Sequence, residues 1–317
     1  MKSYKELYRR LPRQFIDIVS KQYEPGECDD IFAGYMCKRP VTLRINRLKT
    51  DVRHVMDVFR KENIKYERVL WYEDALIIRN KKEKDLEKHN LYQNGDIYLQ
   101  SLSSMIPPLV LEPKSGCKVL DLTAAPGSKT TQIAALMDNK GYIMANELNQ
   151  IRSERLKFNI DRQGVKIAEV TIGDGKKIDE AYNEYFDGVL LDAPCSGTGL
   201  FLVDNPQTYR GWSVKNTLRL VREQKELIKT AVRVLKPGGV LVYSTCSVIK
   251  DENDENINWM MENYKSLISP ETITLKPDGS GSKYNMMDIN GIKDSMMLIF
   301  PSELFEGFFV SKFKKKN

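Results

Sequence analysis

Short apolar stretches alternate with amphipathic ones from about residue 115 onward. Five apolar stretches, rich in Val, Ile and Leu, are predicted to be strands: 118–123, 142–147, 168–173, 186–192 and 239–245. Apolar residues at helical spacing predict helices between most of them, at 129–137, 150–163 and 218–235. Strands that alternate with helices indicate a parallel sheet covered on both faces, which is a doubly wound Rossmann-like α/β fold.

The first third of the chain follows a different pattern. Residues 1–36 read as short helical segments broken by Pro12. In residues 41–46 apolar and polar positions alternate, as in a half-buried strand, which would point the side chain of Arg44 outward. The pattern then predicts a helix, a second strand and a charged loop or linker, at residues 51–62, 68–79 and 80–90.

These elements divide the chain into two expected domains. Residues 1–90 would form a helical segment and a small α/β domain, and residues 91–317 would form the larger domain with the parallel sheet. Residues 307–313 are predicted to be an edge strand close to the C-terminus.

Basic residues are concentrated in the first third. The chain of 317 residues has a net charge of +6, and its first hundred residues hold 21 Lys and Arg against 16 Asp and Glu. Residues 31–50 contain five basic residues and no acid: Lys38, Arg39, Arg44, Arg47 and Lys49. Such a patch favours binding to a polyanion such as nucleic acid, and a charged face exposed to solvent is the alternative.

Composition excludes several classes of protein. No long uncharged apolar run and no N-terminal leader pattern are present, so we expect a cytoplasmic protein with no membrane contact. The five Cys are widely spaced and lack a Cys-x-x-Cys pair, which argues against a disulfide framework and a metal site. Both His lie in the first hundred residues, which argues against a Ser-His-Asp enzyme.

The ends of the first three predicted strands carry groups suited to a nucleoside. The first is followed by a turn of small residues that would let backbone N–H groups approach a ligand: Thr123, Ala124, Ala125, Pro126, Gly127, Ser128 and Lys129. The next two strands end in Glu147, suited to ribose hydroxyls, and Asp174, suited to an exocyclic amine. Neither a dinucleotide nor a P-loop motif is present, which favours S-adenosylmethionine over NAD. Tight turns with solvated acids are the alternative.

Two cysteines follow the fourth and fifth predicted strands, in Asp192-Ala193-Pro194-Cys195-Ser196 and Thr245-Cys246-Ser247. A lone Cys is commonly a small buried hydrophobe, but two at adjacent strand ends suggest thiol chemistry. A thiolate that adds to carbon 6 of cytosine makes carbon 5 nucleophilic enough to attack a sulfonium methyl. One Cys would attack, the other would assist release, and Asp192 would bond the cytosine edge. The pattern does not decide which Cys attacks.

At these residues the chain resembles the RsmB-like Nop/Sun family of S-adenosylmethionine-dependent RNA cytosine-5 methyltransferases. The motifs that carry the resemblance are Ala124-Ala125-Pro126-Gly127 with Lys129-Thr130, Asp192-Ala193-Pro194-Cys195-Ser196 and Thr245-Cys246-Ser247. The resemblance implies that Cys246 is the nucleophile and that Cys195 assists product release. It also implies that the loop 123–129 holds the methionine part of the cofactor, Glu147 the ribose and Asp174 the adenine.

Two further points follow from the resemblance. The family commonly has a second Gly where this chain has Ser128, which would be strained if the turn needed a positive φ. The stretch 41–50 is similar to the family's N-terminal RNA-binding module, so we expect Lys38, Arg39, Arg44, Arg47 and Lys49 to grip RNA.

We therefore hypothesise a monomeric, metal-free RNA cytosine-5 methyltransferase, with ribosomal RNA preferred over transfer RNA as its substrate. Asp192 would belong to both the catalytic and the cofactor-binding group. One alternative is an RNA-binding or ribosome-assembly factor with the same fold and no turnover, which the intact pair of Cys argues against. Another is methyl transfer to protein or DNA, since phosphate contacts do not separate RNA from DNA.

Overall fold

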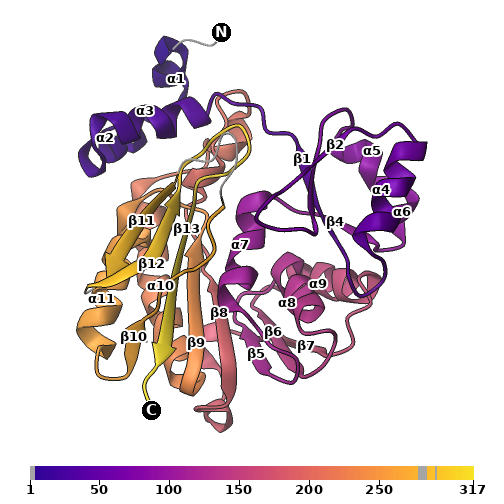
Figure 1. The fold of residues 1–317 in the computed structure, drawn as a ribbon. Helices are drawn as coiled ribbons and strands as arrows, with labels where there is room; N and C mark the ends of the chain where they lie inside the picture. The colour runs from indigo at the N-terminus through magenta and orange to yellow at the C-terminus, as the bar shows by residue number, and fades with distance from the viewer. Residues whose placement is uncertain (1–3, 278–283, 290) are drawn as a thin grey trace.

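The computed structural model describes residues 4–277, 284–289 and 291–317, which build two sheets. Four strands, in the order β2-β3-β1-β4, form a small antiparallel sheet: β1 (Val41–Ile45), β2 (Tyr66–Arg68), β3 (Ala75–Ile78) and β4 (Ile97–Leu99). Three helices share an apolar core with this sheet: α4 (Val52–Lys61), α5 (Glu83–Glu87) and α6 (Asn90–Gln93). Leu43, Phe59, Leu86 and Ile97 are among the residues of its own apolar core. The small sheet lies at the right in Figure 1.

The large sheet contains nine strands among the described residues. Its order is β11-β12-β13-β9-β8-β5-β6-β7, and β10 pairs with β13. The strands are β5 (Lys118–Asp121), β6 (Tyr142–Glu147), β7 (Ala168–Ile172), β8 (Phe186–Asp192), β9 (Leu235–Thr245), β10 (Ile268–Pro270), β11 (Tyr284–Ile289), β12 (Ile292–Ile299) and β13 (Phe308–Lys315). The run from β7 to β9 is parallel, so the predicted doubly wound Rossmann-like sheet is confirmed.

The strand order reverses between β5 and β8. From β5 the chain continues outward through β6 to β7, and it then returns to place β8 and β9 on the other side of β5. Helices α7 (Leu102–Leu111), α8 (Ser128–Leu136) and α9 (Gln150–Arg162) pack on one face of the sheet. Helices α10 (Val214–Val234) and α11 (Asp254–Tyr264) pack on the other. Ligands of such sheets bind outside the carboxyl ends of the strands at the reversal point.

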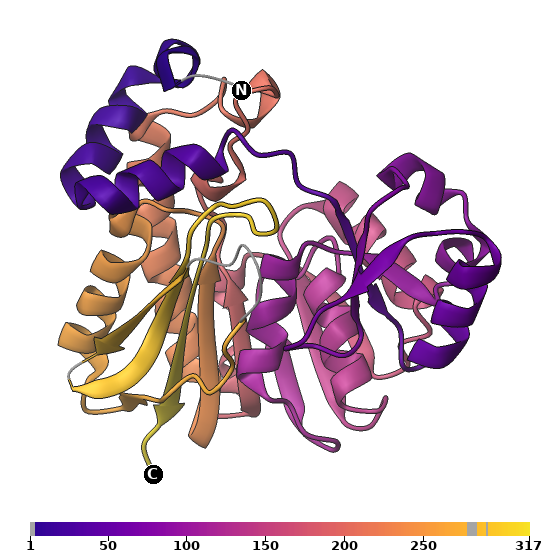
Figure 2. The ribbon, with the colours of Figure 1, turned by 45° about the horizontal axis from the view of Figure 1, so that its top comes forward.

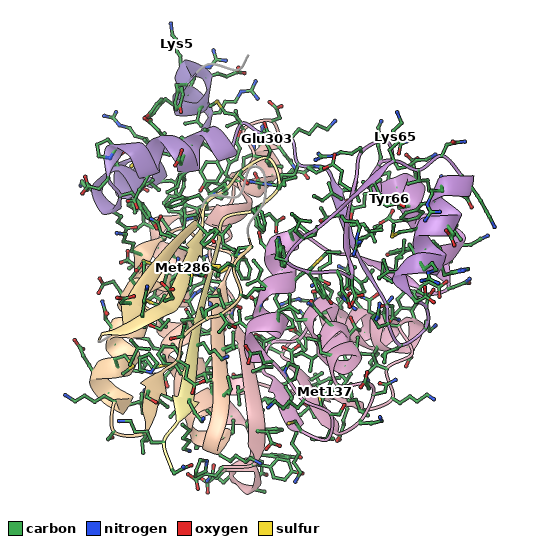
Figure 3. The ribbon with its side chains drawn as sticks, in the orientation of Figure 1. Lys5, Lys65, Tyr66, Met137, Met286 and Glu303 are labelled. Atoms are coloured by element: carbon green, nitrogen blue, oxygen red, sulfur yellow. The ribbon has the colours of Figure 1, made fainter. Side chains whose placement is uncertain are left out.

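The three N-terminal helices pack against the larger domain. α1 (Tyr4–Arg10), α2 (Arg13–Gln22) and α3 (Pro25–Gly34) share an apolar core with α10 and β9. The ring of Phe15 packs against Phe201 at 4.9 Å and against Trp212 at 5.6 Å. Figure 2 shows these helices and the small sheet on opposite sides, with the chain after α3 crossing between them. Lys5 and Lys65 project from the outer ends of these two parts (Figure 3).

Three local predictions are wrong, each for a physical reason. The stretch 68–79 is not one strand: it contains the last residue of β2, a turning segment at residues 69–74 and then β3, which pairs with β2 as a hairpin. The charged run 80–90 contains α5, because Asp85 accepts the backbone N–H of Lys82 at 3.0 Å and caps the helix. β13 lies inside the sheet between β9 and β12, so it is not an edge strand.

The proposed division at residue 90 stays a prediction. The small sheet takes its last strand, β4, from residues 97–99, and the N-terminal helices belong to the core of the larger domain. Within the described part of the chain, no helix is both long and apolar enough to cross a membrane.

Candidate active site

A cavity of about 380 Å³ lies at the carboxyl ends of the parallel strands, where their order reverses. Seven predicted site residues line it: Thr123, Ala125, Glu147, Asp174, Asp192, Cys195 and Cys246. They follow five different strands, and the parallel sheet brings their ends to one edge. The volume is in the range of small-molecule sites.

The loop after β5 shapes one wall of this cavity. Of its predicted residues, Thr123 and Ala125 line the cavity, while Ala124, Pro126, Gly127, Ser128 and Lys129 are not part of its lining. Gly127 has φ of 104° and caps α8. Ser128 is the first residue of α8 and does not have a positive φ, so the strain that the sequence suggested is not present. The turn therefore requires glycine at residue 127 alone.

Glu147 is fixed at the end of β6, with 3% of its surface exposed. Its Oε1 accepts the backbone N–H of Asn149 at 2.9 Å, and its Oε2 lies 3.5 Å from Nη1 of Arg152. Arg152 also donates to the carbonyl of Ala125 at 2.8 Å, so it ties the first two strand-end loops together. We did not predict Arg152. Its place in the first turn of α9, where the helix dipole disfavours a cation, is the signal that could have identified it.

Asp174 and Asp192 complete the acidic lining. Asp174 accepts the backbone N–H of Lys176 at 3.1 Å and pairs with its ammonium at 3.4 Å. Asp192 accepts Ser244 Oγ at 2.8 Å and lies 2.6 Å from Nζ of Lys129. The three carboxylates that line the cavity, Glu147, Asp174 and Asp192, complement a ligand that carries hydroxyls, an amine and a cation. The residues present therefore fit S-adenosylmethionine.

Lys129 is a buried cation beneath the cavity, with 8% of its surface exposed. Besides Asp192, its ammonium donates to Ser104 Oγ at 3.0 Å. Burial by itself lowers the pKa of Lys129, but Asp192, Asp121 and Cys246 outweigh burial and raise the pKa above its ordinary value. The ammonium is therefore retained, and it supplies positive charge near the sulfur of Cys246.

The two predicted cysteines are in contact. Sγ of Cys195 lies 2.7 Å from Sγ of Cys246, and the backbone N–H of Cys246 donates to the Cys195 sulfur at 3.2 Å. The hydrogen bond to Cys246, then burial, raises the pKa of Cys195 well above that of a free thiol. This favours Cys195 as the protonated partner, whose thiol is placed to donate to the sulfur of Cys246.

The two loops that carry the cysteines are locked together. Thr198 Oγ1 contacts Ser247 Oγ at 2.9 Å and accepts the N–H of Val248 at 3.1 Å. The N–H of Gly199 donates to the carbonyl of Cys246 at 2.9 Å. A Cβ on Gly199 would lie 1.9 Å from the carbonyl oxygen of Gly307, so only glycine fits there.

The five basic residues predicted to bind RNA do not share one surface. Lys38, Arg47 and Lys49 are exposed. Arg39 is partly buried, and its Nε donates to the carbonyls of Ser302 and Phe305. Arg47 also pairs with Asp74 at 3.3 Å.

The outward orientation predicted for Arg44 is wrong. The side chain is completely buried and donates to Gln100 Oε1 at 3.2 Å and to Thr131 Oγ1 at 3.0 Å. Its strand β1 is central in the small sheet and is covered on its second face by α8, so the alternation of apolar residues did not mark a solvent face. Arg44 therefore connects the small sheet to helix α8 instead of offering its charge to a phosphate.

Comparisons with known proteins agree with this arrangement. Residues 108–314 match the family model described as 16S rRNA methyltransferase RsmB/F, and residues 11–83 match the RsmF/B-like ferredoxin-like domain. The chain is 35% identical to ribosomal RNA small subunit methyltransferase F of Cronobacter sakazakii over 96% of its own length. It spans 63% of that relative.

Two further relatives match along their whole length. The chain is 34% identical to the tRNA (cytosine(49)-C(5))-methyltransferase of Pyrococcus abyssi, with 98% of this chain and 99% of the relative covered. The crystal structure of a methyltransferase homolog protein from Pyrococcus horikoshii superposes with a TM-score of 0.81 at 28% identity, covering 100% of both chains. The solved structure thus shares the overall fold of this chain.

Asp121, which we did not predict as a site residue, allows a pH test of the strand end that precedes the cavity loop. It ends β5, is 1% exposed and accepts Thr130 Oγ1 at 2.6 Å, and burial raises its pKa to about 7. Between the ordinary carboxyl pKa and this value, the folded chain holds a proton that the unfolded chain has lost. The free energy of unfolding therefore falls as pH rises through that window.

Asp121→Asn keeps an acceptor for Thr130 and removes the titration. Relative to wild type, the variant should gain about 2–4 kcal/mol between about pH 5 and about pH 8, measured by urea unfolding. The exposed Asp161→Asn is the matched control and should run parallel to wild type. A constant difference between Asp121→Asn and wild type at both pH values would contradict the assignment.

Proposed function

Because the chain belongs to the RsmB/F family of 16S rRNA methyltransferases, we propose that it is an RNA cytosine-5 methyltransferase that uses S-adenosylmethionine. The observation that carries the proposal is the contact of 2.7 Å between the sulfurs of Cys195 and Cys246 at the cofactor cavity. An enzyme that methylates a stronger nucleophile than carbon 5 of cytosine needs no thiol at this place.

Cys246 is the nucleophile in this proposal. Its sulfur lies 2.7 Å from that of Cys195, and the buried ammonium of Lys129 lies near it. Attack on carbon 6 forms a carbon–sulfur bond and moves an electron pair to carbon 5. Bound S-adenosylmethionine supplies the electrophilic methyl group that carbon 5 then takes.

Cys195 assists release. When the proton on carbon 5 leaves, the double bond forms again and the bond from carbon 6 to Cys246 breaks, with its electron pair returning to sulfur. The Cys195 thiol, which lies beside that sulfur, stabilises the departing thiolate by donating a hydrogen bond. Asp192 would accept the exocyclic amine of cytosine while Lys129 holds the carboxylate in place.

The cofactor would lie along the loops of the first three parallel strands. The loop of residues 123–129 would hold the methionine part of the cofactor. Glu147 would bind the ribose hydroxyls and Asp174 the adenine amine. Asp192 would be a further carboxylate beside the cofactor. The carboxylate of Glu147 suits its role because Asn149 and Arg152 orient it while it still lines the cavity.

Two RNA classes remain in the proposal. Ribosomal RNA is the preferred substrate, in keeping with the family model and the first relatives. Transfer RNA is the second candidate, favoured by the match along 99% of a tRNA methyltransferase. We place the protein in the cytoplasm as a monomer.

Bisulfite sequencing of both RNA classes from cells with and without the gene decides between ribosomal and transfer RNA. The RNA that is the substrate should lose 5-methylcytosine when the gene is absent.

The cysteine roles predict opposite outcomes for two variants. Cys195→Ala should trap a protein–RNA adduct that survives denaturing electrophoresis, because release is slowed by about a hundredfold or more. Cys246→Ala should form no adduct and transfer no methyl group. Both are assayed with unmodified RNA and labelled S-adenosylmethionine. An adduct with Cys246→Ala and none with Cys195→Ala would reverse the assignment, and labelled product that resists ribonuclease would refute RNA as the substrate.

The exposed basic residues predict a change in salt dependence. Replacing Lys38, Arg47 and Lys49 together with Ala should reduce the slope of log affinity against log salt for RNA by about 2. Arg44→Ala is the matched control: it removes a buried cation, so it should lower the melting temperature and leave the salt slope unchanged. An unchanged slope in the triple variant would show that these residues are only a solvated face.

A further inference from the structure

Glu252 is a completely buried acid behind the loop that carries Cys195. It ends the short helix η5 (Lys250–Glu252), six residues after Cys246. Its Oε1 accepts the backbone N–H of Ser196 at 2.8 Å, and its Oε2 accepts Ser196 Oγ at 2.5 Å. The carboxylate therefore accepts hydrogen bonds from both the backbone N–H and the hydroxyl of Ser196, the residue directly after Cys195.

Rigid elements hold this carboxylate in place. Gln224 of α10 donates to its Oε1 at 3.1 Å and to the carbonyl of Pro194 at 2.9 Å. The hydroxyl of Tyr243, on β9, donates to the backbone carbonyl of Glu252 at 2.6 Å. Glu252 thus transmits the position of the helix and the strand to the loop 194–196 through its two hydrogen bonds with Ser196.

The charges around the thiol pair are arranged asymmetrically. Glu252 lies on the side of Cys195, where its negative charge favours the protonated thiol. Lys129 lies on the side of Cys246, paired with Asp192. Tyr243, whose pKa is raised well above its ordinary value by burial, stays neutral beside Cys195. Burial raises the pKa of Glu252 above its ordinary value, and the donors from Ser196 and Gln224 oppose that rise by favouring the ionised form.

We propose that Glu252 is a positioning residue for the release step, which fixes the sulfur of Cys195 beside Cys246 through Ser196 and keeps the thiol proton there. The inference rests on the proposed methyltransferase function. In that step the proton on carbon 5 passes to a solvent base, its electron pair forms the carbon 5–carbon 6 double bond, and the carbon 6–sulfur pair returns to Cys246. Glu252 touches neither substrate nor cofactor, and it acts through the hydrogen bond that Cys195 donates to the departing thiolate.

Glu252→Gln tests the proposal because it keeps the shape and removes the charge and one acceptor. Steady-state turnover should fall by about tenfold or more, while methyl transfer in the first turnover stays within about threefold of wild type. A protein–RNA adduct should accumulate during turnover, as a weaker version of the Cys195→Ala pattern. Glu255→Gln, an exposed acid three residues further on, is the matched control and should behave like wild type.

The outcomes separate this inference from the function on which it rests. If wild type and Glu255→Gln transfer no methyl group to cytosine, the proposed function fails. If both turn over and Glu252→Gln matches them, or if it loses the first turnover while still binding S-adenosylhomocysteine normally, the role of Glu252 in release is refuted.

Ser196→Ala provides the test if Glu252→Gln does not fold. This variant removes the hydroxyl donor of residue 196 and leaves the buried Glu252 carboxylate bonded to the backbone N–H of that residue and to Gln224. Adduct should accumulate with a smaller fall in turnover, of about threefold. Unchanged turnover with no adduct would overturn the proposal.

Discussion

The contact between two sulfurs depends on the parallel register of β8 and β9. Asp192 pairs with Ser244 in that register, so the residues that follow, Cys195 and Cys246, leave the sheet side by side. Ser244 also donates to Asp192, so the register aligns the carboxylate as well as the thiols. A slip of one residue would turn these side chains to opposite faces of the sheet. The hydrogen bond from the N–H of Gly199 to the carbonyl of Cys246 then holds the two loops together.

Buried charge is the second constraint on this site. Lys129 and Asp192 lose most of their hydration, and a buried pair is stable only with good geometry and additional hydrogen bonds. Ser104 and Ser244 supply those bonds. The same principle explains Glu252, whose three donors come from protein groups in place of water. The site thus holds charges of both signs close to the Cys195–Cys246 pair, each oriented by a neighbour from a different element.

Predictions from sequence were correct where they depended on neighbouring residues and wrong where they depended on contacts between distant segments. The strands β5, β6 and β8 and their end residues were found because each is a local apolar run followed by a motif. Arg44 was placed on the wrong side because its strand is buried on both faces, which depends on α8 more than 80 residues away. The residues 307–313 were expected at an edge, but β12 pairs with β13 and covers it. Arg152, Asp121 and Glu252 were missed because their roles depend on partners from other elements.

The sequence by itself determined the α/β class, the small-residue turn, and the acids and cysteines that follow the strands, because each depends only on neighbouring residues. Only the tertiary structure decided which groups meet. It brought Cys195 and Cys246, 51 positions apart, to 2.7 Å, and it set Lys129 beside Asp192 and Glu252 behind Ser196. It also separated the exposed Lys38, Arg47 and Lys49 from the buried Arg44. Distances, burial and the resulting proton affinities arise from strand pairing and helix packing between distant segments, and no local pattern records them.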